Sequence, residues 1–311
     1  MMRSANLEGL KSPAIQTALG AALAGRPSAL ESWLCRYGAG AERRPNLNLA
    51  AALGVELAAV GPAVSRSGAV GRLLARLAAN DAAPDTPEVF LPTAAAFGWA
   101  AWIGAGRDRE AAWAALGALA ADERAPVRLG VREALRGLAG RPGGADELVR
   151  AASGWLAWEE RELRYGAAGV AGEVLGDRQV VTAIDDVPAL LSYVSSLIEE
   201  AAGAPRAAER SDGRRRLLLS LPGACAAIAA YLRGGDRGPA WLEAACIEAR
   251  HPDVRAALSS AILALRKIAT APGPAVVQRL RQALEGSAKP PRDPTRRRPG
   301  TDRGRDSRRM K

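Results

Sequence analysis

Two tryptophan–glutamate pairs at four-residue spacing offer the clearest chemistry in the sequence, within the segment SGWLAWEERELR. On a helix, residues four apart lie one turn apart on the same face, so each ring would sit beside a carboxylate. An exposed indole can stack on a flat ligand, and a carboxylate can stabilise positive charge that develops next to it. The alternative is that both rings belong to a buried core. The pairs are Trp155–Glu159 and Trp158–Glu162, accompanied by Arg161 and Arg164.

A stripe of arginines is the second candidate. Its members follow one another at four-residue steps, which places them on one slowly drifting face of a helix. Such a ridge could contact phosphate groups, or it could be an ordinary solvated face. Only four of the 43 basic residues are lysine, so arginine is abundant everywhere and its presence alone says little about phosphate recognition. The stripe consists of Arg124, Arg128, Arg132 and Arg136.

Other catalytic and metal-binding patterns are missing from the sequence. His251 is the only histidine, and beside Pro252 it is typical of a helix start. The cysteines Cys35, Cys225 and Cys246 lack paired or metal-type spacing, as in a reduced, cytosolic protein. There is no nucleophile-elbow motif and no glycine-rich phosphate loop. We therefore expect no catalytic residue, no metal, no cofactor and a cytoplasmic location.

The composition favours helices packed on helices. Hydrophobic residues make up 48% of the chain, but aromatic residues only 4%, so Ala, Leu and Val must fill the core. Small side chains let helices approach closely, whereas sheets favour β-branched and aromatic residues. The longest uncharged stretch, 89–106, only just reaches the length needed to cross a bilayer. It is rich in Ala and Gly and contains Pro92, so we interpret it as a buried helix and expect no membrane span.

The net charge of +10 is concentrated at the C-terminal end. Residues 287–311 hold ten basic and three acidic residues, which accounts for +7 and leaves +3 for residues 1–286. This segment has no apolar periodicity, so we expect a disordered basic tail. Such a tail could bind nucleic acid or another acidic partner.

Helix start and stop signals recur every ~15–20 residues, a spacing typical of short globular helices. Ser28 to Glu31 form a capping box, and Asn46 can cap the helix that follows it. Further helices are predicted to begin near Pro62, Pro87, Asp108 and Pro126, and to span 145–157, 161–175, 187–201, 214–233, 238–249, 252–270 and 274–285.

Three of these segments share one pattern. An apolar residue and an arginine are followed by a small residue, and then by apolar residues at three- and four-residue steps. The arginines are Arg128, Arg164 and Arg255. The first two are 36 residues apart and the last two 91 apart, close to one and two periods of a ~40–47-residue helical repeat.

The segments DERAPVRLGVREALRGLA (122–139) and HPDVRAALSSAILALRKIA (251–269) resemble the second helices of HEAT repeats. The resemblance is good over 108–139 and 239–270 and fair over 145–175. It implies an all-α fold, a right-handed α-α superhelix of roughly seven stacked helix pairs. We expect this domain to span 1–286, interrupted by an inserted polar loop at 203–216.

The resemblance also implies structural roles for Arg128, Arg164 and Arg255. In HEAT repeats the arginine at this position typically reaches an acid in the neighbouring turn. Here Asp122 or Glu123 would serve Arg128, and Asp253 would serve Arg255.

A fold of this kind usually binds partners along an extended surface. We therefore expect a non-catalytic scaffold for a macromolecular partner, with a protein favoured. The alternative is nucleic-acid binding through the tail or the concave face. Some HEAT-like solenoids are DNA glycosylases that remove alkylated bases, although their key acid is Asp where this chain has Glu. The candidate interaction residues are Arg124, Arg132, Arg136, Trp155, Trp158, Glu159, Glu162 and Arg161. Nothing in the sequence indicates the oligomeric state.

Overall fold

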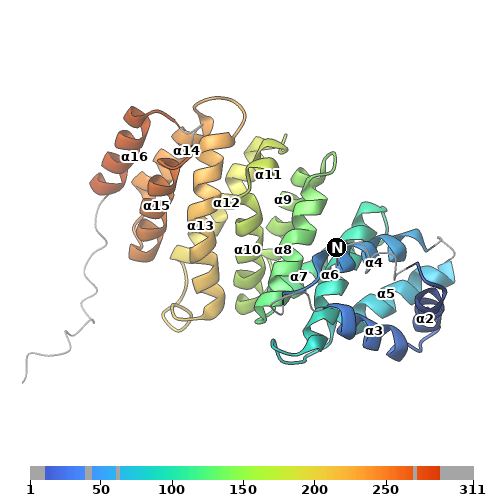
Figure 1. Ribbon diagram of the computed structural model, residues 1–311. Coiled ribbons are helices and arrows are strands. Elements are labelled where there is room, and N and C mark those ends of the chain that lie inside the picture. Colours follow the sequence, from blue (N-terminus) through green and yellow to red (C-terminus); the bar gives the residue numbers. More distant parts are fainter. Residues whose placement is uncertain (1–10, 39–43, 61–63, 269–271, 288–311) are drawn as a thin grey trace, which may run out of the picture.

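The described part of the chain is a stack of helices. The computed structural model describes residues 11–38, 44–60, 64–268 and 272–287, and the side chains of all of these except 64–67. Within these ranges there are 15 α-helices and one 3₁₀ helix, and no β-strand is formed (Figure 1). Apart from Ser287, the predicted basic tail lies outside the described residues.

The helices fall into three consecutive groups. The N-terminal group is α2 (Pro13–Leu23), α3 (Ser28–Gly38), α4 (Leu47–Ala59), α5 (Val64–Ala78), η2 (Pro87–Val89) and α6 (Phe90–Gly104). The central group is α7 (Arg109–Ala120), α8 (Ala125–Ala139), α9 (Gly144–Trp155), α10 (Arg161–Leu175) and α11 (Arg178–Thr182). The C-terminal group is α12 (Val187–Ala202), α13 (Asp212–Tyr231), α14 (Arg237–Glu248), α15 (Pro252–Leu265) and α16 (Pro274–Gly286). Most predicted helices match these within a few residues, whereas α2 and α11 were not predicted.

The local signals act largely as expected. The side chain of Asn46 accepts a hydrogen bond from the Leu49 amide and caps α4. Pro87 opens η2, and Pro126 lies in the first turn of α8. The capping box at Ser28 was wrong in detail, because α3 already includes Ser28. The Glu31 amide bonds the Pro27 carbonyl, which makes Pro27 the residue before the helix.

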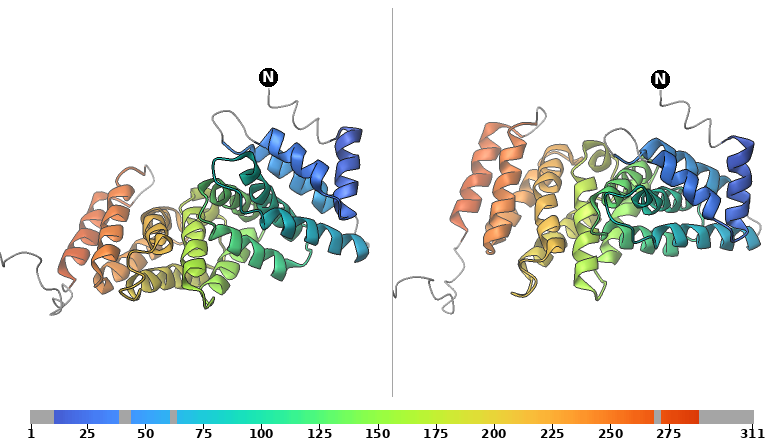
Figure 2. Two further views of the ribbon diagram at one scale, coloured as in Figure 1. Left: turned by 90° about the horizontal axis from the view of Figure 1, so that it is seen from below. Right: turned by 60° about the horizontal axis from the view of Figure 1, so that its bottom comes forward.

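Successive helices pack in two layers. In one layer α4, α6, α8, α10, α13 and α15 contact one another in turn, while α7, α9 and α12 follow each other in the second layer and α14 packs on α16. Helices that are neighbours in sequence also pack together, and Figure 2 shows the pairs laid side by side from the N-terminal group to α16. This confirms the predicted all-α, solenoid-like stack of helix pairs, an armadillo/HEAT-like helical repeat fold.

Close contact between α10 and α13 holds the middle of the stack together. Every residue of α10 from Tyr165 to Gly172 is buried. A Cβ atom added at Gly172 would lie 2.4 Å from the Ser220 hydroxyl oxygen, so no larger residue fits there without a shift. Small residues thus let α13 lie directly on α10, as the composition suggested.

The predicted loop at 203–216 is shorter than expected. Helix α13 begins at Asp212, so only 203–211 connects α12 to α13. Arg214 lies in the first turn of α13 with its side chain only 1% exposed. The polar sequence misled the prediction because the side chains of Arg214 and Arg216 bond to neighbouring turns rather than extending into water.

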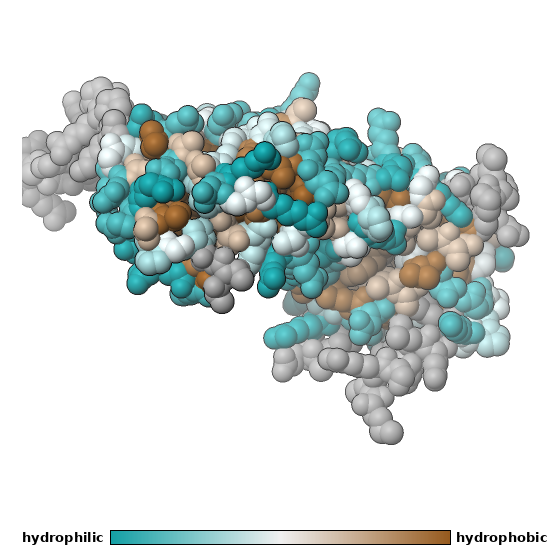
Figure 3. All heavy atoms as spheres, turned by 90° about the horizontal axis from the view of Figure 1, so that it is seen from above, coloured by the Kyte–Doolittle hydropathy of each residue, from teal (hydrophilic) through white to brown (hydrophobic). Residues whose placement is uncertain are grey.

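The long uncharged segment forms α6, which is buried at nearly every position. Trp99 and Trp102 both lie in the core, with their ring centroids 6.0 Å apart. Among the described residues, no helix is both long enough and apolar enough to cross a membrane. On the face seen in Figure 3, hydrophobic residues form separate patches among hydrophilic ones.

Candidate functional site

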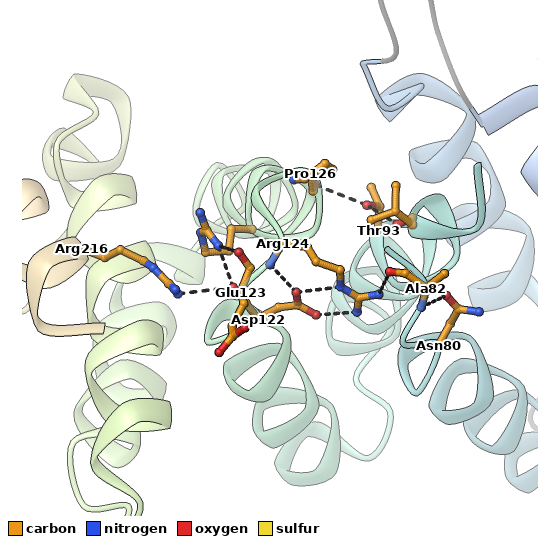
Figure 4. A network of polar contacts seen from close by, with 10 residues as sticks. Asn80, Ala82, Thr93, Asp122, Glu123, Arg124, Pro126 and Arg216 are labelled. Atoms are coloured by element: carbon orange, nitrogen blue, oxygen red, sulfur yellow. Dashed lines mark hydrogen bonds and ion pairs between the residues drawn. The ribbon is translucent and has the colours of Figure 1, made fainter. Parts of the chain in front are cut away.

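Arg124 is held in the turn between α7 and α8. Its guanidinium donates two hydrogen bonds to the Asp122 carboxylate, at 2.9 and 2.7 Å, and a third at 3.0 Å to the carbonyl of Ala82 (Figure 4). The side chains of Arg124 and Asp122 are only 15% and 14% exposed. The bonds to Asp122 raise the pKa of Arg124 above its usual value. This arginine therefore ties the turn to the preceding helices.

Arg132 and Arg136 continue the stripe, but each faces carboxylates. Arg132 pairs with Glu133 at 3.1 Å and with Glu173 of α10 at 3.4 Å. Arg136 pairs with Glu133 at 2.8 Å and with Asp177, just after α10, at 3.4 Å. The predicted face of arginines exists, but acids from the next repeat neutralise it, so it is not an open basic ridge.

The three repeat arginines make the same hydrogen bond. In each, Nη1 donates to the main-chain carbonyl six residues earlier: Arg128 to Asp122 at 2.8 Å, Arg164 to Trp158 at 2.8 Å and Arg255 to Ala249 at 3.4 Å. These carbonyls lie in the turns that follow α7, α9 and α14, within three residues of the helix ends.

The expected acid partners differ from those observed. The carboxylate of Asp122 bonds Arg124, while Arg128 bonds only main-chain oxygens. The carboxylate of Asp253 binds Arg214 at 2.9 Å rather than Arg255. A carbonyl at a helix end offers the partial negative charge that an acid was expected to supply, and it is always present.

A further arginine, Arg216 of α13, reaches the same turn. Its Nη1 donates to the Asp122 carbonyl at 3.4 Å, as Arg128 does (Figure 4). Burial and the nearby charge of Arg216 lower the pKa of Arg128. The two side chains therefore fasten α13 and α8 to the end of α7.

Of the tryptophans of the first candidate, Trp155 is buried and Trp158 is half-buried against the core. Trp155 is buried, its indole nitrogen donates to the Trp113 carbonyl at 3.2 Å, and its ring lies 6.2 Å from the rings of both Trp113 and Trp158. A Cβ added at Gly117 would lie 2.4 Å from the Trp158 ring, so that ring packs on α7.

The expected tryptophan–glutamate pairs are not formed. Trp155 ends α9 and Arg161 begins α10, so the segment crosses a turn and the helical spacing does not apply. Glu159 is exposed in that turn. Glu162 accepts a hydrogen bond from the Gly213 amide at 3.3 Å and thereby supports the start of α13. These residues do not converge on one ligand site.

Arg161, in contrast, lies on a groove of about 550 Å³ between α9, α10 and α12. We call this surface the α9–α12 groove. Small side chains at facing positions leave the space open: Ser153 and Ala157 on one side, Ser192 and Ser196 on the other. Its polar lining comprises Ser153, Arg161, Arg164, Tyr165, Ser192, Tyr193, Ser196, Glu199 and Glu200.

Charges of both signs line this groove. Arg164 of α10 pairs with Glu200 of α12 at 3.1 Å and links the two walls. Arg161 lies one turn earlier on α10, is exposed, and makes no ion pair or side-chain hydrogen bond within the described part of the chain. The same holds for the carboxylate of Glu199, next to Glu200. The groove therefore presents one unpaired cation and one unpaired anion.

The two tyrosines of the groove stay protonated near neutral pH. Burial, and then the charge of Glu200, raise the pKa of Tyr165, and full burial raises the pKa of Tyr193 far above its usual value. The hydroxyl of Tyr193 has no hydrogen-bond partner among the described residues. Both phenols are buried beneath the groove, so they belong to its supporting core and not to its ligand-contacting surface.

Among the described residues, the lining of the groove includes no histidine beside its serines. The side chain of His251 accepts a hydrogen bond from the Asp253 amide at 3.2 Å and caps α15. Among the described residues, no group of three or more His, Cys, Asp or Glu is arranged to hold a metal ion. Serine hydroxyls in the groove can therefore take part in hydrogen bonds, and His251, the only histidine, is not on the groove.

Arg161 is the predicted interaction residue that the structure places on this groove. The sequence offered a partial signal for the rest, because Ser192, Ser196 and Glu199 lie three and four residues apart on one face of α12. Their relevance depends on α9 and α10 lying opposite, which the spacing within α12 does not reveal.

Comparisons with known proteins concern the fold. No protein-family model matches the chain, and no curated protein sequence matches it. Among solved structures, an engineered protein is 17% identical over 82% of this chain and 97% of its own, with a TM-score of 0.29. The designed armadillo repeat protein YIII(Dq)4CqI is 17% identical over 81% of this chain and 98% of its own, with a TM-score of 0.27. The helical repeat assignment rests on the helix packing described above.

Proposed function

We propose that the protein is a non-catalytic scaffold that binds a protein partner through the α9–α12 groove. The observation that carries this proposal is the unpaired charge of Arg161 and Glu199 on a groove of about 550 Å³. Elsewhere the candidate arginines are satisfied by carboxylates or carbonyls. Charged groups that the fold leaves unpaired at a concave surface are available to a partner.

The mixture of charges favours a protein over a nucleic acid. Binding of a duplex depends on an excess of cations that neutralise phosphates. The groove instead carries two arginines and two glutamates, and the α8 stripe is neutralised by Glu133, Glu173 and Asp177. Protein surfaces commonly present both charges together with hydrogen-bonding groups, and they match such a lining.

Site-specific photo-crosslinking tests this proposal. A photoreactive amino acid at Ser192, in the groove, should form adducts with a partner protein in cells. The same amino acid at Ser259, which is exposed on α15 and outside the groove, is the matched control. The Ser192 adduct should weaken strongly when Arg161→Glu is added. Equal adducts at both positions, or a Ser192 adduct that is indifferent to Arg161→Glu, would refute the proposal.

What supports the alternative of nucleic-acid binding is the composition of the basic tail, residues 287–311. A salt titration of binding to random-sequence duplex, with and without these residues, separates it from the groove. We expect any duplex binding to be salt-dependent and to vanish with the tail. If duplex binding survives removal of the tail but is lost in the double variant Arg132→Ala with Arg136→Ala, the helical body binds the duplex.

A further inference from the structure

We propose that the α9–α12 groove recognises a linear peptide segment that carries one acidic and one basic residue. The acidic side chain would bind Arg161 and the basic side chain Glu199. This inference rests on the proposed function and specifies the chemistry of the partner. Three features of the groove support it: the arrangement of its charges, its hydroxyl groups and its floor.

The charges are arranged on opposite walls. Arg161 belongs to α10 and Glu199 to α12, and the fixed Arg164–Glu200 pair at 3.1 Å lies between those helices. Arg164 and Glu200 are paired with each other, whereas Arg161 and Glu199 form no ion pair among the described residues. A ligand of single sign satisfies one wall and leaves the other unpaired. A ligand with both signs satisfies both.

The hydroxyl groups suit a polypeptide main chain. Ser192 and Ser196 lie one turn apart on α12, and Ser153 faces them from α9. The hydroxyls of Ser192 and Ser196 can donate to a carbonyl and accept from an amide, while that of Ser153, which already donates to the Val149 carbonyl at 2.8 Å, can still accept from an amide. These groups can serve an extended backbone whatever its side chains. Their small size also leaves room for that backbone, which longer side chains at these positions would fill.

The floor is apolar and rigid. Tyr165 and Tyr193 are buried at 1% and 2% exposure, and Leu156 packs beside them against the core. These side chains have already lost their freedom in the fold, so the groove above them is pre-formed and its support adds no ordering cost on binding. Ligand affinity then depends on the two charge contacts and on main-chain hydrogen bonds.

Selection from a random peptide library on the purified full-length chain tests this inference. Peptides selected by the wild-type protein should contain both an acidic and a basic residue. Binding of a selected peptide should fall about tenfold or more in Arg161→Glu and in Glu199→Lys, since charge-assisted hydrogen bonds are lost and like charges meet. The charge-exchanged peptide should bind best to the double variant Arg161→Glu with Glu199→Lys.

Controls separate recognition from folding. Arg150→Glu, on an exposed position of α9 outside the groove, should leave peptide binding unchanged. All variants should keep the wild-type circular dichroism spectrum and melting temperature. A phosphoserine version of the selected peptide tests whether the cation prefers a doubly charged anion, and it should still require Glu199 for its basic residue.

The outcomes distinguish this inference from the proposed function. Selection of peptides with one sign of charge, or affinities that ignore both charge reversals, would overturn the inference. If the Ser192 crosslink still depends on Arg161, the groove binds a folded partner and the scaffold function stands. If that crosslink also fails, both proposals fall together.

Discussion

Two arginine-bearing surfaces of this molecule differ in how many of their arginines are paired with acids of a neighbouring helix. On α8, Arg132 and Arg136 face Glu173 and Asp177 of the following repeat, and all four charges are compensated. On the α9–α12 groove, Arg161 has no such partner in the described chain, although its neighbour Arg164 pairs with Glu200. Both surfaces carry arginines on consecutive helical turns, so the sequence presents them as equivalent.

The difference arises from the register between neighbouring repeats. Glu173 and Asp177 are four residues apart, as are Arg132 and Arg136. Each arginine of α8 therefore lies opposite one acid at the α8–α10 contact. Between α10 and α12, among the described residues, only the Arg164–Glu200 ion pair is formed. An arginine thus becomes part of the scaffold or part of a binding surface according to what the next helix places opposite it.

Arg214 occupies a third environment, in which its guanidinium is buried and bonded to groups of the protein itself. It is 1% exposed, and its guanidinium donates to the carbonyls of Ala201 and Glu209 and to the Asp253 carboxylate. Arg214→Ala should lower the free energy of unfolding by about 3–5 kcal/mol, because it removes a buried, fully bonded side chain. Urea denaturation followed by circular dichroism measures this loss.

The adjacent Arg215 is the matched control for that experiment. It is exposed on the same helix, so Arg215→Ala should change the free energy of unfolding by less than about 0.5 kcal/mol. Asp253→Asn should have an intermediate effect, since Asp253 is 52% exposed and water can compensate part of the loss. Equal effects of Arg214→Ala and Arg215→Ala would contradict the structural role.

Arg124 should show the next largest effect. Its bidentate contact with Asp122 is largely shielded from solvent, and it also bonds the Ala82 carbonyl. We expect Arg124→Ala to cost roughly 2 kcal/mol of unfolding free energy, through lost charge-assisted bonds. A double-mutant cycle with Asp122→Ala measures the coupling, and a coupling near zero would show that the pair contributes nothing to stability.

The helices were predictable because their signals act within one turn. Asn46 caps α4 through a residue three positions away, and the ladder after Arg128 recurs after Arg164 and Arg255. These local patterns were enough to predict the all-α stack of pairs. They also predicted a helix over 214–233, close to α13, but they could not predict that Arg214 is buried, because a charged side chain is ordinarily exposed and here finds its bonds across a turn.

The binding surface was less predictable because its parts come from separate helices. Arg161 was identified as a candidate, but Glu199 and the groove serines lie on a different helix, and only the packing of α12 beside α9 brings them opposite. The tryptophan–glutamate pairs failed for the converse reason. Their spacing assumed one continuous helix, and the turn after Trp155 interrupts it.

The ion pairs of the α8 stripe should contribute less to stability than Arg124. Arg132 and Arg136 are about one third exposed, where water and salt weaken such pairs. Each alanine variant should lose no more than ~1 kcal/mol of unfolding free energy, and the loss should shrink as salt is raised from 0.05 to about 0.5 M. A loss that does not vary with salt would indicate packing rather than charge pairing.

The smallest effect on stability is expected at Arg161. Arg161→Ala removes no ion pair within the described part of the chain, so the free energy of unfolding should stay within about 0.5 kcal/mol of wild type. The same variant should lose most of the crosslink formed from Ser192. Arg132→Ala should do the reverse and lower stability slightly while leaving the crosslink intact. If Arg161→Ala were as destabilising as Arg124→Ala, Arg161 would belong to the scaffold, and the distinction between paired and unpaired arginines would no longer locate the binding surface.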